Sequence, residues 1–138
     1  MALLNVFDIA GSALGAQSVR LNVTASNLAN VNSIGRNAAS TYRAREPLFQ
    51  PVYNQFMKAD ASAVGVKVKG IIESKAELRR EYRPNHPYAD EQGYVYLPNV
   101  NAIEEMANMI SASRAYQNNI EVINASKEML LRTLSLGH

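Results

Sequence analysis

The sequence predicts a mainly α-helical protein, in which long N- and C-terminal helices pack as a coiled-coil-like hairpin and flank a small, irregular β-containing middle region. Apolar residues recur at helical spacing near both ends, and these two stretches carry very few charges. In the middle of the chain, apolar residues alternate with others as in a strand. A surface helix normally places charged side chains on its outer face. We therefore expect the terminal helices to be buried on several sides, partly by other chains.

The N-terminal helix is expected from about Leu3 to Asn30. Between Met1 and Gly35 only Asp8 and Arg20 are charged. Asn5 is a candidate N-cap, and Asn30 supplies a stop signal because asparagine tolerates the left-handed conformation. The apolar stripe of this helix consists of Phe7, Ala10, Leu14, Leu21 and Leu28.

The middle region predicts strands. Valines at 64, 66 and 68 alternate with Gly65, Lys67 and Lys69, the pattern of a half-exposed strand that continues towards Ile72. The stretch from Pro47 to Tyr53 is a candidate partner, restricted to a sheet edge by its two prolines. The stretch from Tyr94 to Leu97 is a third candidate strand.

The C-terminal helix is expected from about Asn101 to Leu136. Asn101 and Glu104 resemble a capping box, and Arg132 suits the end of the helix dipole. Two seven-residue series define a heptad-like seam with polar breaks: Met106, Ser113, Ile120, Lys127 and Leu134, and Met109, Tyr116, Ile123 and Leu130. From residue 111 to residue 126, only Arg114 and Glu121 are charged.

We expect no catalytic residues, no metal and no cofactor. The chain has no cysteine, and His86 lies in a turn-rich loop with too few ligands for a metal, since His138 is terminal. The basic residues between 79 and 83 interleave with Glu77 and Glu81, which favours a solvated face over nucleic-acid binding. No stretch approaches the about 18 apolar residues of a membrane span, and the N-terminus lacks the basic start of a cleaved signal.

Five segments resemble the terminal blocks of bacterial flagellar rod, hook and hook-associated proteins, and among these the proximal rod subunits. They are residues 1–14 (MALLNVFDIAGSAL), 25–30 (ASNLAN), 93–95 (GYV), 98–101 (PNVN) and 109–122 (MISASRAYQNNIEV). The chain departs from the pattern after residue 30, where it reads VNSIGRN and many relatives continue with Thr, Gly and an aromatic residue. The length also fits a proximal rod subunit, because hook and distal rod proteins are longer.

The resemblance implies a non-enzymatic subunit of a torque-transmitting tube around the export channel. Residues 1–35 would form an N-terminal assembly helix with its Asn-rich motif, 36–98 a middle module outside the tube, and 99–138 a C-terminal assembly helix. Implied partners are other rod proteins, the rod-base adaptor, the export gate and MS ring, and copies of the chain itself. The implied location is the periplasmic rod of the basal body, reached by export without a cleaved signal peptide.

We expect the assembly interface to include both stripes and the Asn-rich motif. Its residues would be Phe7, Leu14, Leu21, Asn27, Leu28, Asn30, Met106, Met109, Tyr116, Ile120, Ile123, Leu130 and Leu134. A different class of function remains open on the residues alone, namely a helical-hairpin adaptor or regulatory protein that binds one partner as a closed dimer.

Overall fold

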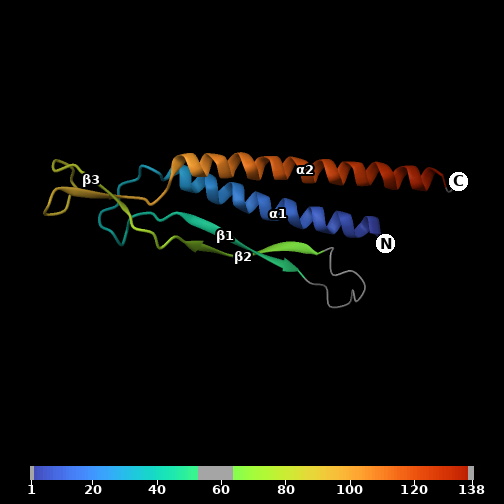
Figure 1. Cartoon of the computed structure of the whole chain (residues 1–138), viewed down its shortest axis with the longest axis horizontal. Helices are drawn as coiled ribbons and strands as arrows, with labels where there is room; N and C mark the ends of the chain where they lie inside the picture. Colours follow the sequence, from blue (N-terminus) through green and yellow to red (C-terminus); the bar gives the residue numbers. More distant parts are fainter. Residues whose placement is uncertain (1, 53–63, 137–138) are drawn as a thin grey trace.

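Two long antiparallel helices and two small antiparallel sheets make up the fold (Figure 1). The structure is a computed structural model that describes residues 2–52 and 64–136. Its elements are α1 (Ala2–Ala29), β1 (Arg45–Val52), β2 (Gly65–Glu73), β3 (Arg79–Tyr82), β4 (Tyr94–Leu97) and α2 (Ala102–Ser135). The β1–β2 ribbon runs along α1, while β3 lies at the end of the molecule opposite the two chain termini (Figure 1). The prediction of two long terminal helices around a β-containing middle region is confirmed.

Helix α1 begins earlier than its sequence signals indicated. It starts at Ala2, so Asn5 lies inside the helix and the prediction of an N-cap at this position is wrong. The helix ends at Ala29, as expected, but without a left-handed residue, because only Gly93 has a positive φ among the described residues. A side-chain hydrogen bond caps the last turn instead, because Asn30 Nδ2 donates to the Ser26 carbonyl oxygen at 2.9 Å.

The β1–β2 ribbon confirms the two predicted strands in the first half of the middle region. Arg45 pairs with Glu73 at one end and Val52 with Gly65 at the other, and the register shifts between Leu48 and Phe49. The predicted end of the first strand, Tyr53, lies outside the described residues. The backbone of Arg45 faces α1 rather than β2. Because strand residues alternate in direction, both prolines, at 47 and 51, occupy this same outer edge, where their missing N–H groups leave no donor for a further strand.

Strand β3 was missed by the sequence analysis because it has no apolar alternation. All four of its residues are exposed, and it is held by backbone pairing with β4, in which Tyr82 pairs with Tyr94. The basic run is exposed, as a solvated face would be, and the Arg79 guanidinium also donates to the carbonyl oxygens of Pro98 and Val31. The connection between the strands ends in Gly93, whose φ of 84° favours glycine.

Helix α2 begins as predicted. Asn101 is the N-cap, and its side-chain oxygen accepts from the N–H groups of Ile103 and Glu104. Arg20 on α1 donates to Asn108 Oδ1 on α2 at 3.1 Å, which joins the two helices near the start of α2. Because the helices are antiparallel and α2 is longer, the end of α2 extends past the start of α1 (Figure 1).

Helix α1 lies between α2 and the β1–β2 ribbon, so this chain itself covers two sides of its low-charge helix. The buried apolar side chains in the described ranges are mostly alanine and valine; the only larger one is Leu97. On α1 they are Ala10, Ala16 and Val23, and these small side chains allow close packing. The ribbon covers a side of α1 whose burial we expected other chains to provide.

Ser12 anchors the far end of the ribbon on α1. Its hydroxyl donates to the Ile9 carbonyl oxygen at 2.7 Å and accepts from the Val66 N–H at 3.1 Å. A Cβ atom on Gly65 would come within 2.9 Å of the same hydroxyl. The absence of a side chain at Gly65 therefore permits this close contact. An isolated two-stranded ribbon is marginally stable in water, so such anchors matter.

Replacing this anchor should weaken the folded subunit. Ser12→Ala leaves the Val66 N–H without its partner, and we expect a loss of about 1 kcal/mol in the free energy of unfolding. Urea unfolding of the purified subunit measures it. Ser18→Ala on the same helix is the control, because no hydrogen bond of this hydroxyl is found in the described part of the chain. Equal stability of the two variants would contradict the anchoring role.

Candidate assembly site

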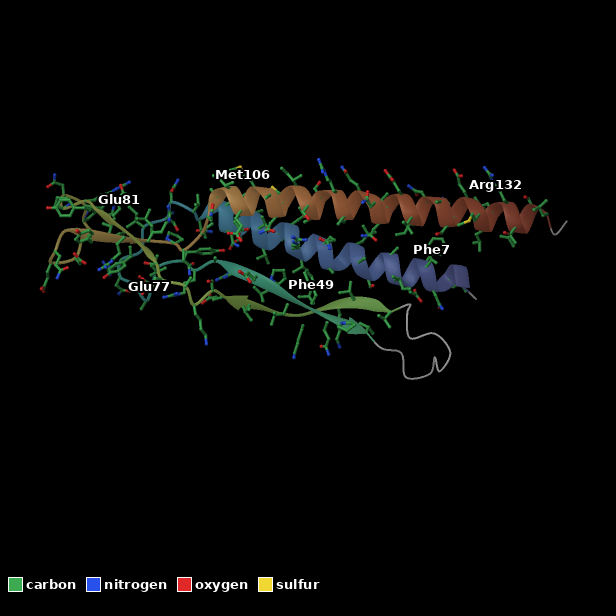
Figure 2. All side chains as sticks on the ribbon, viewed as in Figure 1. Phe7, Phe49, Glu77, Glu81, Met106 and Arg132 are labelled. Carbon is green, nitrogen blue, oxygen red and sulfur yellow. The ribbon has the colours of Figure 1, made fainter. Side chains whose placement is uncertain are left out.

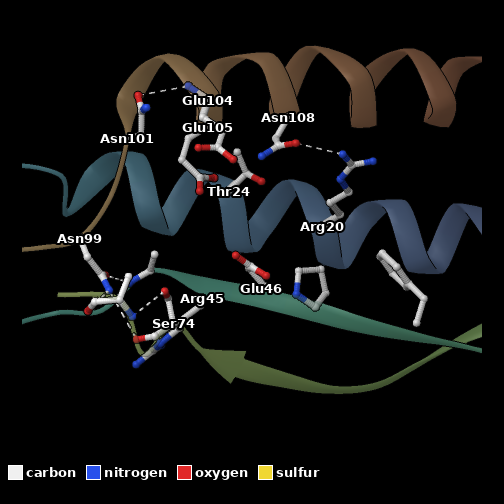
Figure 3. A pocket seen from close by; sticks show the side chains of 14 residues that line it. Arg20, Thr24, Arg45, Glu46, Ser74, Asn99, Asn101, Glu104, Glu105 and Asn108 are labelled. Atoms are coloured by element: carbon white, nitrogen blue, oxygen red, sulfur yellow. Dashed lines mark hydrogen bonds between the residues drawn. The ribbon is translucent and has the colours of Figure 1, made fainter. Parts of the chain in front are cut away.

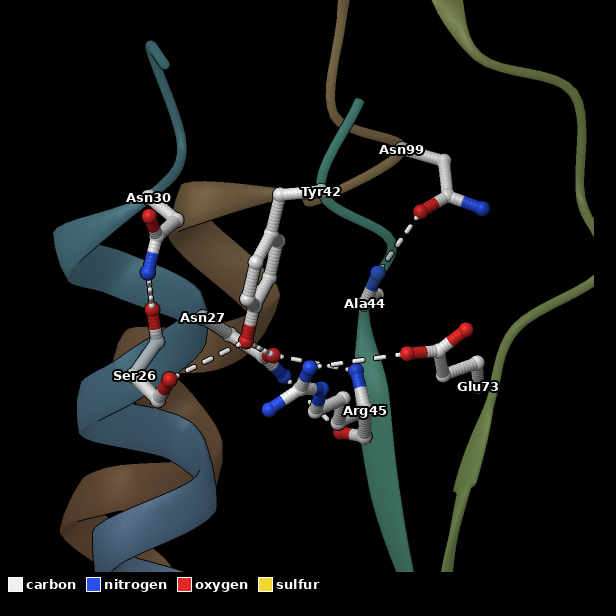
Figure 4. A network of polar contacts seen from close by, with 8 residues as sticks. All are labelled: Ser26, Asn27, Asn30, Tyr42, Ala44, Arg45, Glu73 and Asn99. Carbon is white, nitrogen blue, oxygen red and sulfur yellow. Dashed lines mark hydrogen bonds and ion pairs between the residues drawn. The ribbon is translucent and has the colours of Figure 1, made fainter. Parts of the chain in front are cut away.

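A buried asparagine connects α1, β1 and α2. Asn27 is 1% exposed. Its Nδ2 donates to the Arg45 carbonyl oxygen at 2.9 Å and to Glu105 Oε1 at 3.1 Å, while its Oδ1 accepts from the Arg45 N–H at 3.0 Å and the Tyr42 hydroxyl at 2.8 Å. The amide thus pairs with both backbone groups of one strand residue, as a neighbouring strand would (Figure 4). Its hydrogen-bonding capacity is used within the subunit.

Neighbouring side chains extend this connection. The hydroxyls of Ser26 and Tyr42 lie 3.2 Å apart in hydrogen-bond contact, and the Arg45 guanidinium lies 5.3 Å from the Tyr42 ring centroid. Asn99 Oδ1 accepts from the Ala44 N–H at 2.8 Å, which holds the chain just before β1 (Figure 4). The segment 25–30 therefore has a structural role inside the subunit. Tyr42 belongs to no periodic pattern in the sequence, while Asn99 lies within one of the segments that carry the family resemblance.

A polar cleft of about 540 Å³ opens between α2 and β1 (Figure 3). Glu104 and Glu105 on α2 and Glu46 on β1 line it, together with Arg20 and Thr24 from α1. Arg45 also lines the cleft, so its charges are mixed. Small-molecule sites are usually lined mainly by apolar and aromatic side chains, which distinguishes them from this polar cleft.

The polar side chain of His86 is used for contacts within its own loop. Its Nδ1 accepts from the Tyr88 N–H at 3.1 Å, and its ring packs edge-on against Tyr88. No group of three or more potential metal ligands occurs within residues 2–52 and 64–136. In the same ranges, none of the helices is long and apolar enough to cross a membrane.

The surroundings of Glu105 on α2 shift the pKa of its carboxyl. Partial burial raises its pKa above the ordinary value of 4.5, and repulsion from Glu104 and Glu46 acts in the same direction. Hydrogen bonds from Asn27 and Thr24 oppose the shift without cancelling it. The ionised carboxylate is therefore less favourable in the folded subunit than in the unfolded chain.

The expected interface residues fall into three groups. Asn27 is buried, as described above. Three are exposed: Met106 at 49%, Ile120 at 38% and Leu134 at 61%. The others are half-buried: Phe7, Leu14, Leu21, Leu28, Asn30, Met109, Tyr116, Ile123 and Leu130. Figure 2 shows Met106 on the outer side of α2, away from α1.

The series that contains Met106 does not form the seam with α1, which corrects the expected packing of α2. Most of the less exposed positions of α2 form a row at alternating spacings of three and four: 102, 105, 109, 112, 116, 119, 123, 126 and 130. One expected series is part of this row, but its companion is Glu105, Ala112, Asn119 and Ser126. Hydropathy favoured the series that contains Met106. The contact with α1 uses small and polar side chains instead, because they allow the helices to approach closely and form hydrogen bonds. The apolar residues of the Met106 series therefore lie on the side of α2 that faces away from α1.

Helix α2 carries many exposed apolar side chains. They are Ile103, Met106, Ile110, Ile120, Val122, Met129, Leu131, Leu134 and Leu136, with exposures from 38% to 87%. Exposed apolar surface that is large enough marks sites of protein interaction. Ile103 and Ile110 lie outside the two heptad series. Their apolar character at positions outside both series is the sequence signal that could have indicated an exposed apolar side of this helix.

Comparisons with known proteins agree with this picture. The family described as "Flagella basal body rod protein" matches residues 7–35, which cover most of α1 and the turn after it. The family described as "Flagellar basal body rod FlgEFG protein C-terminal" matches residues 91–136, which include β4 and α2. The fold, the exposed apolar helix and these matches define a structural protein of the flagellar basal-body rod class.

Full-length relatives narrow this class. The chain is 54% identical to the flagellar basal-body rod protein FlgC of Salmonella typhimurium over 138 residues, with 99% of both chains covered. It is 53% identical to FlgC of Escherichia coli O157:H7 and 44% identical to FlgC of Buchnera aphidicola from Acyrthosiphon pisum, again over 99% of each chain. The chain belongs to the FlgC family of flagellar basal-body rod proteins. It is a structural subunit of the rod and not an enzyme.

Removing the buried amide should destabilise the subunit strongly. Asn27→Ala leaves the N–H and carbonyl groups of Arg45 without their partner and removes one of the two contacts of the Tyr42 hydroxyl, so we expect a loss of about 2–4 kcal/mol in the free energy of unfolding. Asn22→Ala, at an exposed position on the same helix, should change it by less than about 0.5 kcal/mol. Urea unfolding compares the two. A small effect at Asn27 would argue against its role as the main connection.

Stability should also depend on the ionisation of Glu105. Because its folded pKa is raised, its contribution is fully present below about pH 4.5 and is lost as the pH rises through the folded pKa. Glu105→Gln removes this carboxyl, so the variant should lose less stability than the unmodified protein between pH 4.5 and pH 7. Thermal unfolding across this range measures the difference, with Glu121→Gln, an exposed carboxyl of α2, as control. Identical profiles for Glu105→Gln and the unmodified chain would contradict the effect of burial.

Proposed function

We propose that this chain is a subunit of the proximal rod, and that it polymerises with other rod proteins and copies of itself through its terminal helices. The product would be the torque-transmitting tube around the export channel. The observation that supports this most directly is the exposed apolar surface of α2, which no other part of the described chain covers. Burying such side chains between subunits contributes about 25 cal/mol per Å² of apolar area removed from water.

The total surface supports the same proposal. The chain exposes 9945 Å², whereas a compact monomer of 15.2 kDa exposes about 7,100 Å². An elongated shape and a thin core of small side chains contribute to the difference. Permanent assemblies commonly bury about 2,000 Å² or more in total, so a subunit of this shape has surface to spare for several neighbours.

The parts of the chain would divide this work as the family resemblance implies. Residues 1–35 and 99–138 would assemble, with the antiparallel α1–α2 pair packing as a coiled coil, and the middle module of residues 36–98 would lie outside. The alternating spacing of three and four along the less exposed row of α2 supports this packing. Further proposed partners are the rod-base adaptor, the export gate and the MS ring. The subunit would reach the periplasm by flagellar export, without a cleaved signal peptide.

The proposed interface keeps the residues expected from the sequence, with different tasks. The exposed members Met106, Ile120 and Leu134 would contact neighbouring subunits directly. The half-buried members would set the spacing of α1 and α2, and Asn27 would hold the subunit in the form that assembles. A closed adaptor dimer would instead stop growing at a fixed size.

Charges at the end of α2 should block assembly without unfolding the subunit. Leu131 and Leu134 are 55% and 61% exposed, so changing both to Asp should alter the free energy of unfolding by less than about 1 kcal/mol. We expect no rod beyond this subunit and no motility. Urea unfolding, swimming in soft agar and electron microscopy of isolated basal bodies measure the three effects.

Arg132→Ala is the matched control, because Arg132 lies on the same turn and its only ion pair in the described chain is an exposed one with Glu128. This variant should swim normally. Normal hooks on cells that carry the double Asp variant would contradict the proposed role of the α2 end.

A further inference from the structure

We infer that the apolar flank of α2 in one subunit packs against the open face of α1 in a second copy of the chain. The apolar flank of α2 is defined as Ile103, Met106, Ile110 and Ile120. The open face of α1 is defined as Gly11, Gly15, Asn22, Ala25 and Ala29. This contact is head-to-tail, because it joins different surfaces of the two copies. It rests on the proposed function and specifies which faces of the terminal helices meet.

The apolar flank is a continuous feature of α2. Ile103, Met106 and Ile110 follow one another at spacings of three and four, which places them on one side of the helix. Their exposures are 77%, 49% and 57%, and Ile120, on the same side, is 38% exposed. Because the α2 seam with α1 uses other positions, the fold of the subunit does not need these side chains.

The open face of α1 is shaped for close approach. All five of its residues are exposed, and they follow the helical spacing of one side. Nothing lies within 4 Å of a Cβ atom built on Gly11 or on Gly15, so packing within the subunit gives no reason for either glycine. Glycine lowers helix propensity, and a neighbouring helix that lies close to the backbone explains its presence here.

The two faces match in size if α2 of one copy and α1 of the next are antiparallel and have the same axial alignment as α1 and α2 within a subunit. There, Glu105 on α2 is opposite Asn27 on α1. Both helices rise by the same distance per residue, so positions equally far from this pair lie at the same level. Ile103 is then level with Ala29, and Ile120 is level with Gly11 to within one residue. Large side chains of the flank therefore meet small residues of the open face.

The charges of the two faces match as well. Asp8 is the only acidic residue of α1 and lies on its exposed side. At the same level, Lys127 of α2 comes within one helical turn of Asp8, on the side of α2 that carries the apolar flank. The opposite charges meet beyond the apolar part of the contact, which favours this pairing of faces over a shifted one.

These matches favour a second copy in a repeating, open arrangement. Subunits that stand side by side around a tube run parallel, so α2 of one and α1 of the next are antiparallel, as α1 and α2 are within a subunit. A head-to-tail contact leaves one open face and one flank free after each addition, so it propagates. A symmetric contact between two open faces would leave the apolar flank uncovered.

Disulfide cross-linking tests the contact, because the natural chain has no cysteine. The test variant combines Gly11→Cys with Ile120→Cys, and its matched control combines Gly11→Cys with Glu121→Cys. Glu121 is adjacent to Ile120 but points about 100° away around the helix. A disulfide needs Cα atoms within about 7 Å. The variants replace the natural chain in cells, and isolated basal bodies are treated with a mild oxidant.

We expect the test variant to form dimers and longer ladders on a non-reducing gel, and the control and both single-cysteine variants to remain monomeric. A second pair, Ala25→Cys with Met106→Cys, should give the same ladder, with Ala25→Cys and Ala107→Cys as its control. This second pair decides the result if the first is not incorporated into basal bodies.

The outcomes separate the contact from the proposed function. Incorporated test variants that form no intermolecular cross-link would overturn the contact and leave the rod assignment standing. Cross-linking of the single Gly11→Cys variant would show a symmetric contact and overturn the head-to-tail arrangement. Absence of the unmodified chain from isolated basal bodies would overturn the proposed function, and the contact with it.

Discussion

The pairing of the Asn27 amide with the backbone of Arg45 is the interaction on which the arrangement of this subunit depends. The middle strands form only two-stranded sheets, and such ribbons are marginally stable alone. One buried side chain fixes β1 to α1, and through Glu105 it also fixes α2. Ser12 repeats the device at the other end of the ribbon. Directional hydrogen bonds thereby position elements that a thin apolar core would hold only loosely.

The small side chains of the interior have a consequence for the exterior. Because the seam of α2 uses residues such as Ala112 and Ser126, much of the apolar surface of α2 is not used inside the subunit. A free subunit therefore keeps on its surface the apolar area that other proteins place in their core. Apolar area that becomes buried between subunits stabilises an assembly rather than the monomer, which is the physical basis of the role that we propose for this surface. The thin interior and the exposed flank therefore have the same cause, namely the small side chains of the seam.

Local sequence signals predicted most elements of the fold. Asn101 marked the start of α2, and the valines of β2 marked a half-exposed strand, because caps and alternation act over a few residues. Strand β3 escaped because its four residues are exposed and show no apolar alternation along the sequence. The prediction of Asn5 as an N-cap was wrong because a polar residue can also lie within the first turns of a helix that begins earlier in the chain. In the candidate site, the exposed positions of Met106, Ile120 and Leu134 were not predictable from hydropathy, which ranks these residues as interior.

The sequence by itself determined that two low-charge helices stand at the ends of the chain, that strands lie between them, and that the terminal blocks match flagellar rod proteins. Periodicity, caps and motifs are properties of neighbouring residues, so they can be read along the chain. Tertiary structure alone decided which side of each helix is covered. The hydrogen bonds of Asn27 with Arg45 and Glu105 join residues that are distant in the sequence. They set the rotation and level of the helices, and this geometry turns a polar row inward and leaves an apolar flank exposed on α2.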